Sequence, residues 1–234
     1  MEQSYYINTF GTLFIVLAMG TDVTKKVGRP IGSTDLKMEQ LYQTALRVFG
    51  DRGFEATTLT EIALEAGITR SSINYHFGSK MELWKRTIDY LTNQFIIEFH
   101  SNQKFHKDLD DISLLRVVIR QMVHFWAKDN GFGRMAYREM DQPGERADYF
   151  IENMMYPLVN LTKDVFGRLR KQGVIKKFDK QYQLSIILGM VSYIFANSYM
   201  FEKMHGVDTK DEALIDQHAD AVIDIFFNGI RTSQ

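Results

Sequence analysis

The segment Thr58–Leu83, TLTEIALEAGITRSSINYHFGSKMEL, restricts the possible folds more than any other part of the chain. Apolar residues recur at helical spacing over Leu59–Ala66, and Gly67 follows as a helix stop. A second helix is predicted over Thr69–Phe77, with its apolar side chains on one inner face. Two short helices joined by a glycine turn are typical of a helix-turn-helix, whose second helix enters the major groove of DNA.

Capping sequences support these helix boundaries. Both Thr58–Glu61 (TLTE) and Ser79–Glu82 (SKME) fit the capping box, in which the hydroxyl and the carboxylate satisfy backbone N–H groups that the helix leaves free. Gly53 and Gly78 stand where the preceding helices must end. A first helix over Asp35–Asp51 is predicted to brace the other two.

The outer face of the predicted second helix carries hydrogen-bonding side chains that suit phosphates and base edges. Lys80 and the free backbone amides at the helix start near Ser79 are predicted to bind phosphate. The predicted DNA contacts from this region are Thr58, Thr69, Arg70, Ser71, Ser72, Asn74, Tyr75, His76 and Lys80.

Over residues 36–86 the chain resembles the TetR-type transcriptional regulators. The residues that carry the resemblance are Phe49, Gly53, Thr58, Thr60, Ile62, Ala63, Ala66, Gly67, Ile68, Tyr75, His76, Phe77, Lys80 and Leu83. The ending His218–Ile230 resembles the last helix of the same family, whereas Asn74 stands where the family usually has an apolar residue. The resemblance implies an effector-binding repressor that dimerises through its last two helices.

The N-terminal residues hold two separate features. Lys25–Pro30 (KKVGRP) lies just before the first helix, and Arg29 is predicted to insert into the minor groove; a solvated basic tail is the alternative. Residues 10–19, FGTLFIVLAM, are apolar but shorter than the ~20 residues that span a bilayer, and no basic residue precedes them. We expect either translation from Met19 or a genuine segment that packs on the body or a partner.

Charge and composition agree with this interpretation. The net charge is −1, yet residues 23–86 hold ten Lys or Arg against seven Asp or Glu, so this segment is at +3 and the rest at −4. The chain has no cysteine and only three prolines. We expect an all-α cytoplasmic protein: an N-terminal extension and basic arm (1–34), a three-helix helix-turn-helix domain (35–83) and a larger helical effector-binding and dimerisation domain (84–234).

The third region is rich in large, soft side chains. Helices are predicted over residues 84–99, 112–128, 131–140, 146–172, 180–203 and 210–231, with Pro157 able to kink the fourth. Most of the large residues suit a core, but an apolar cavity for an apolar or amphipathic effector is also predicted. The predicted effector contacts are Phe95, Phe99, Met122, Phe125, Trp126, Tyr137, Met140, Met154 and Tyr193, while His124, Arg138 and Glu139 suit either polar ligand contacts or ion pairs.

The last two helices carry apolar stripes. These are Leu184, Leu188, Val191 and Phe195 on one helix and Ala219, Val222, Ile223 and Phe226 on the other. We predict that they form a homodimer contact; the alternative is that they face the chain's own core. A dimer would place two helix-turn-helix domains (residues 35–83, here called the reading heads) about one DNA turn apart, roughly 34 Å, on a near-palindromic operator. Effector binding is predicted to move the helix that starts at Ser79 and so change the spacing of the heads.

Two other classes of function remain as alternatives. An enzyme is disfavoured because no HExxH, GxSxG, P-loop or dinucleotide motif is present and the six histidines are scattered. We therefore expect no cofactor, no metal site and no membrane association. The second alternative is a helical small-molecule or lipid-binding protein that lacks DNA function; operator binding distinguishes it from a regulator.

Overall fold

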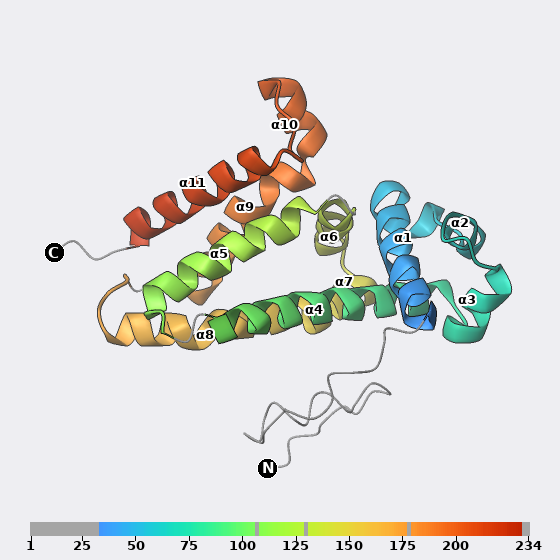
Figure 1. Ribbon diagram of the computed structural model, residues 1–234, viewed down its shortest axis with the longest axis horizontal. Coiled ribbons are helices and arrows are strands. Elements are labelled where there is room, and N and C mark those ends of the chain that lie inside the picture. The colour runs from blue at the N-terminus through green and yellow to red at the C-terminus, as the bar shows by residue number, and fades with distance from the viewer. Residues whose placement is uncertain (1–32, 106–107, 129–130, 177–178, 231–234) are drawn as a thin grey trace, which may run out of the picture. The chain divides into compact units, whose positions relative to one another are not determined.

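The all-α architecture is confirmed by the computed structural model, which describes residues 33–105, 108–128, 131–176 and 179–230. No strand occurs in these ranges. The first three helices are α1 (Ser33–Ala56), α2 (Leu59–Glu65) and α3 (Arg70–Phe77), shown in Figure 1. The predicted basic arm with Arg29, and residues 1–18, lie outside the described residues.

The remaining helices follow in chain order (Figure 1). They are α4 (Lys80–Phe105), α5 (Asp111–Ala127), α6 (Phe132–Asp141), α7 (Glu145–Phe150), the π-helical turn η1 (Ile151–Met155), α8 (Tyr156–Lys171), α9 (Lys180–Ala196), α10 (Ser198–His205) and α11 (Glu212–Ile230). The domain boundary predicted after residue 83 therefore falls inside a continuous helix, α4. That boundary stays a prediction.

Local signals account for the helix-turn-helix. Thr58 caps α2 with a complete capping box, as predicted, and Thr69 caps α3. Gly67 adopts a φ of 65° in the turn between them, a conformation that glycine takes at little cost. Ile73 and Phe77 are buried on the inner face of α3, so the opposite face is left to solvent.

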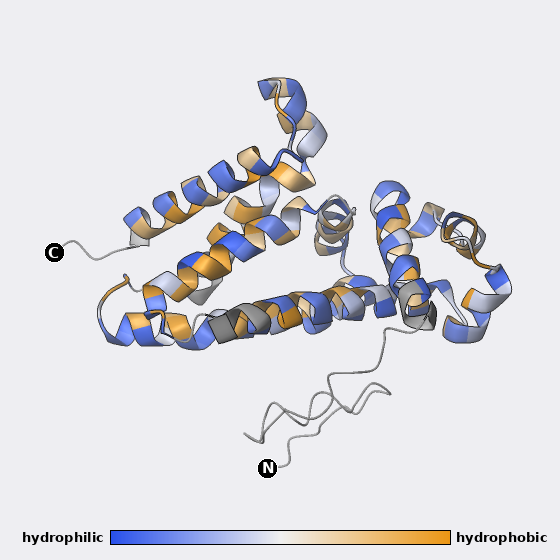
Figure 2. Cartoon of the chain, in the orientation of Figure 1, coloured by the Kyte–Doolittle hydropathy of each residue, from blue (hydrophilic) through white to orange (hydrophobic). Residues whose placement is uncertain are grey.

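The core of the rest of the chain is built around α5, which packs against α8, α9 and α11. Its buried side chains include Leu115, Ile119 and Val123, which is fully buried. Figure 2 shows apolar and polar residues alternating along α5 and α11, as expected for helices with one buried face. This packing brings both α8 and α9 against α5, the arrangement that forms the cavity described below.

Two long predicted helices are interrupted. The helix predicted over 146–172 is divided by η1, in which the Tyr156 N–H donates to the Ile151 carbonyl rather than to residue 152. Proline has no N–H and its ring crowds the carbonyl four residues earlier, so the wider turn just before Pro157 relieves that clash. The helix predicted over 180–203 breaks at Asn197, with φ −114° and ψ 34°.

The predicted dimer stripes lie inside the subunit. Val191, Phe195, Ala219, Val222, Ile223 and Phe226 are all buried within the chain, and Leu188 lines an internal cavity. The prediction that these side chains form the contact between subunits is therefore wrong, and the alternative that they face the chain's own core is right for them. The side chain of Leu184 lies outside the described residues.

Candidate functional site: nucleic-acid interface and internal cavity

The outer face of α3 is open to solvent. Arg70, Ser71, Asn74, Tyr75 and His76 are exposed, and Ser72 is half-buried. Tyr75 is 86% exposed, so its aromatic ring does not contribute to the core. Its ring meets the His76 ring edge-on at 5.1 Å between centroids. The face therefore offers an aromatic ring, hydroxyls, an amide and a cation to a partner.

The start of α3 is held in place from two sides. The Thr69 hydroxyl oxygen accepts the Ser72 N–H at 3.2 Å and lies 2.9 Å from the Ser71 hydroxyl oxygen. Arg70 Nη1 donates to Thr60 Oγ1 on α2 at 3.2 Å. These contacts fix the N-terminal turn of α3, where the free backbone N–H groups favour an anion.

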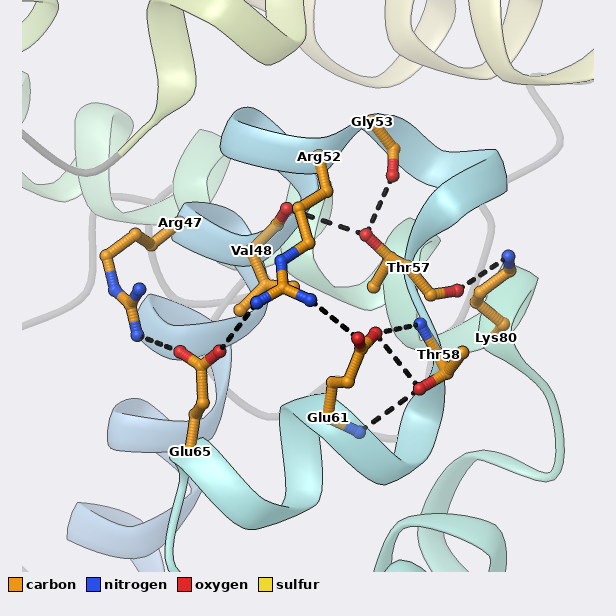
Figure 3. A network of polar contacts seen from close by, with 9 residues as sticks. All are labelled: Arg47, Val48, Arg52, Gly53, Thr57, Thr58, Glu61, Glu65 and Lys80. Carbon is orange, nitrogen blue, oxygen red and sulfur yellow. Dashed lines mark hydrogen bonds and ion pairs between the residues drawn. The ribbon is translucent and has the colours of Figure 1, made fainter.

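A polar network fastens α2 to α1 (Figure 3). Glu61 accepts from the Thr58 N–H at 2.9 Å, from the Thr58 hydroxyl at 3.0 Å and from Arg52 at 2.5 Å. The Thr58 N–H, then its hydroxyl and then Arg52 hold the pKa of Glu61 below its ordinary value. Arg47 pairs with Glu65 beside it. Thr58 thus has a capping role, with its hydroxyl both donating and accepting inside the box.

Lys80 is directed into the protein. Its ammonium donates to the carbonyl oxygens of Phe54 at 2.7 Å, Thr57 at 2.9 Å and Glu55 at 3.2 Å. It also lies 4.4 Å from the centre of the Phe54 ring. These carbonyls belong to the last turn of α1 and the connection to α2, where helical partners are missing. All three ammonium protons have a protein acceptor, which leaves none of them for a DNA phosphate.

Helix α6 touches the reading head directly. A Cβ built at Gly50 of α1 would lie 2.3 Å from the carbonyl oxygen of Gly131, at the start of α6. Arg138 Nη1 donates to the Gly50 carbonyl at 2.9 Å, and Arg134 pairs with Asp51 at 2.6 Å. The backbones of α1 and the start of α6 are in van der Waals contact at this point, and Arg134 and Arg138 of α6 bond to α1 beside it.

Arg146 extends this contact to α7. It pairs with Glu139 at 2.9 Å and with Glu55 at 3.0 Å, and its guanidinium lies 4.3 Å from the centre of the Phe54 ring. Burial raises the pKa of Glu139 above its ordinary value, and the hydrogen bond from Arg146 opposes that shift. Arg138 and Glu139 therefore take part in the contact between α1 and α6. His124, the third residue predicted to make either a ligand contact or an ion pair, lies 3.1 Å from Asp216.

An apolar cavity of about 240 Å³ lies among α5, α8 and α9. Four of the nine predicted effector contacts line it: Met122, Phe125, Trp126 and Met154. The other predicted contacts lie elsewhere. Phe95 and Phe99 are buried in the core, Tyr137 shares a hydrogen bond of 2.9 Å with Ser192, Met140 is half-buried, and Tyr193 is 50% exposed.

Sequence reasoning missed the wall of the cavity that α8 supplies. Its lining residues are Leu158, Val159, Asn160, Thr162, Lys163, Phe166 and Arg170, and Met155 of η1 precedes them. Their spacing of three, four and seven residues was a usable signal for a shared helix face. Phe132 of α6 also lines the cavity, so α6 contacts both the cavity and α1.

An unpartnered apolar stripe runs along α9. Tyr182, Ile186 and Tyr193 are 57%, 48% and 50% exposed, and Ile225 of α11 is 63% exposed. His218 Nε2 of α11 lies 2.9 Å from the Met190 carbonyl of α9, so these helices lie side by side. Residues three, four and seven apart share a helix face, so Tyr182, Ile186 and Tyr193 share a face of α9, and His218 and Ile225 share a face of α11.

The described residues contain no group of three His, Asp or Glu side chains that could hold a metal ion. Nor is any helix within the described ranges both long and apolar enough to cross a bilayer.

Comparison with protein families gives two matches along the chain. Residues 41–87 match the family described as bacterial regulatory proteins, tetR family. Residues 112–226 match the tetracyclin repressor-like C-terminal domain. The first match contains α2 and α3, and the second contains all the residues that line the cavity.

Individual proteins agree with the family matches. The HTH-type transcriptional regulator RutR of Escherichia coli (strain K12) is 20% identical over 91% of this chain and 99% of RutR. The uncharacterized HTH-type transcriptional regulator YerO of Bacillus subtilis (strain 168) is 41% identical, over 23% of this chain and 19% of YerO. The crystal structure of FadR from Bacillus subtilis in complex with stearoyl-CoA superposes with a TM-score of 0.63 at 19% identity, covering 80% of this chain and 97% of FadR.

Proposed function

The chain belongs to the TetR family of bacterial regulatory proteins and is a DNA-binding transcriptional regulator, and from that premise we propose that it is a cytoplasmic repressor released from its operator by a small molecule. As a homodimer it binds a near-palindromic DNA site. We propose no catalytic role and no resident cofactor.

The observation that carries this proposal is the face of α3. Thr69 caps the helix, Ile73 and Phe77 fix its inner side, and Tyr75 projects 86% exposed from the other side. Arg70, Ser71, Ser72, Asn74, Tyr75 and His76 are the proposed DNA contacts, with the N-terminal amides of α3 and α4 near phosphates. Arg29 remains a proposed minor-groove contact.

The proposed release mechanism is a population shift. Phe132 places α6 at the cavity, while Arg134 and Arg138 place the same helix on α1. A ligand that favours a different position of α6 therefore also favours a different position of the reading head, together with α4. Coupling of ~1–3 kcal/mol would change operator affinity by about 5- to 150-fold.

The experiment that tests the proposal is selection of bound genomic DNA fragments by the purified full chain, followed by sequencing. Enrichment of one near-palindromic site supports the proposal. A folded dimer that enriches no site at low salt would contradict it and would favour the alternative, a helical small-molecule or lipid-binding protein without DNA function.

Replacing Tyr75 with alanine is expected to weaken binding to the selected site roughly tenfold to hundredfold, because each base-edge or stacking contact contributes about 1–3 kcal/mol. The free energy of unfolding should stay unchanged, since the ring is exposed. Fluorescence anisotropy with labelled DNA measures the affinity. Tyr199→Ala on α10 is the matched control, because Tyr199 is 79% exposed and outside the reading head. Equal affinities of both variants would remove Tyr75 from the interface.

Replacing Lys80 with methionine is expected to lower the free energy of unfolding by roughly 2 kcal/mol, because three carbonyls lose a charged donor. Urea denaturation measures this change. The slope of log affinity against log salt should not change, whereas Arg70→Met should reduce that slope by about 1. The Arg70 variant should lose no more than about 1 kcal/mol of stability, because it loses a single exposed hydrogen bond, to Thr60. A reduced salt slope with normal stability for Lys80→Met would restore the phosphate assignment.

A further inference from the structure

The cavity among α5, α8 and α9 is asymmetric in charge. Its charged lining residues are Lys163 and Arg170, and no Asp or Glu is among the described residues that line it. The other polar lining residues are Asn160 and Thr162, also on α8, while α5 and α9 contribute apolar side chains. Polar and cationic groups are thus confined to one wall.

The two cations stand on one face of α8. Lys163 and Arg170 are seven residues apart, which is two helical turns or about 10 Å along the axis. Phe166, which is 2% exposed, lies between them on the same face and belongs to the apolar lining. Lys163 is exposed and Arg170 is half-buried, so this wall reaches from the apolar interior to solvent.

We propose that the effector of this protein is a compact amphipathic anion, with a short apolar tail among Met122, Phe125 and Trp126 and a carboxylate or phosphate head at Lys163 and Arg170. This inference rests on the proposed function, in which the cavity is the effector site. Apolar walls favour the tail by removing it from water, and charge-assisted hydrogen bonds from the α8 wall hold the head. A cationic ligand would be repelled by the same wall.

The volume limits the tail. At about 240 Å³ the cavity lies just below the roughly 300–1,000 Å³ of pockets for drug-sized ligands. A single short alkyl chain or one small ring system fits this size, whereas a large fused-ring ligand does not. Met122, Met154 and Met155 supply flexible walls that can follow the contour of such a tail.

The test compares four probes that share one alkyl chain: decanoate, decyl phosphate, decanol and decylammonium. Binding to the full chain without DNA is measured by titration calorimetry, and release is measured with the selected operator fragment. Decanoate or decyl phosphate should bind at least roughly tenfold more tightly than decanol, and decylammonium more weakly still. Comparing decanoate with decyl phosphate distinguishes a carboxylate head from a phosphate head.

Variants then locate the head group. Lys163→Met and Arg170→Met should each weaken binding of the anionic probe roughly tenfold and leave decanol binding unchanged. Lys171→Met is the matched control, because Lys171 is exposed on the same helix and does not line the cavity; it should bind as the unmodified chain does. Met122→Trp, which fills the cavity, should abolish binding of every probe.

Decanol or decylammonium binding as tightly as decanoate would overturn the proposal, as would anion binding that Lys163→Met and Arg170→Met leave unchanged. No binding of any probe would also overturn it. Because calorimetry is performed without DNA, these outcomes are independent of whether a genomic site is enriched. If the probes contradict an anionic effector but a genomic site is enriched, the repressor proposal stands. If the anionic probes bind as expected but no genomic site is enriched, the repressor proposal fails and the anion site stands.

Discussion

Gly50→Ala is expected to lower the free energy of unfolding by about 3 kcal/mol or more. The added Cβ would lie 2.3 Å from the Gly131 carbonyl oxygen, 2.6 Å from its Cα and 2.7 Å from its carbonyl carbon. These are backbone atoms, so no side chain can rotate away, and overpacking of this kind typically costs about 1–3 kcal/mol and sometimes more. Relief requires that α1 and α6 move apart, which also breaks the bond from Arg138 to the Gly50 carbonyl.

Urea or thermal denaturation of the variant measures this loss. Gly167→Ala is the matched control, because Gly167 lies within α8 and a Cβ there has nothing within 4 Å. The control should raise stability by roughly 0.5–1 kcal/mol, since alanine loses less backbone freedom than glycine in a helix. If Gly50→Ala were as stable as the unmodified chain, α1 and α6 would not be in contact.

The double substitution Ile186→Glu and Ile225→Glu is expected to convert the dimer to monomers. Both side chains are exposed in the single chain, Ile186 on the apolar stripe of α9 and Ile225 on α11, which lies beside α9. Placing carboxylates in an apolar contact between two copies leaves buried charges without partners, a cost that the contact cannot offset. The monomer itself should stay folded, because neither side chain contributes to its core.

Loss of the dimer should weaken operator binding by about a hundredfold to ten-thousandfold, because two linked heads gain that factor from effective concentration. Sedimentation velocity reports the assembly state and anisotropy reports the affinity. Ile97→Glu is the control, since Ile97 is 50% exposed on α4 and away from the stripe. A double variant that still sediments as a dimer would place the subunit contact on another surface.

The reading head could be predicted from the sequence because its signals are local. The Thr58 capping box, the glycine turn at Gly67 and the apolar positions Ile73 and Phe77 all act within a few residues of each other. Such short-range contacts are encoded by spacing along the chain, and the exposed face of α3 follows from the buried one.

The roles of single residues in tertiary contacts could not be predicted in this way. An exposed lysine before a helix suits phosphate, yet Lys80 meets carbonyls that lie 23 to 26 residues earlier in the chain. In the same way, apolar periodicity identified Val191 and Val222 as members of an inner face but not which neighbour that face would meet. The pattern is identical for a core, a cavity and a dimer contact.

The sequence by itself determined the all-α class, the helix-turn-helix and the polar face of α3, because caps, turns and periodicity are properties of neighbouring residues. Only the tertiary structure decided which apolar residues line the cavity and which carbonyl groups accept hydrogen bonds from Lys80 and Arg138. It also decided that residue 50 must lack a side chain, because the Gly131 carbonyl group occupies that space. These features depend on how helices distant in the chain approach one another. That approach is set by the sum of many weak packing contacts rather than by any local pattern.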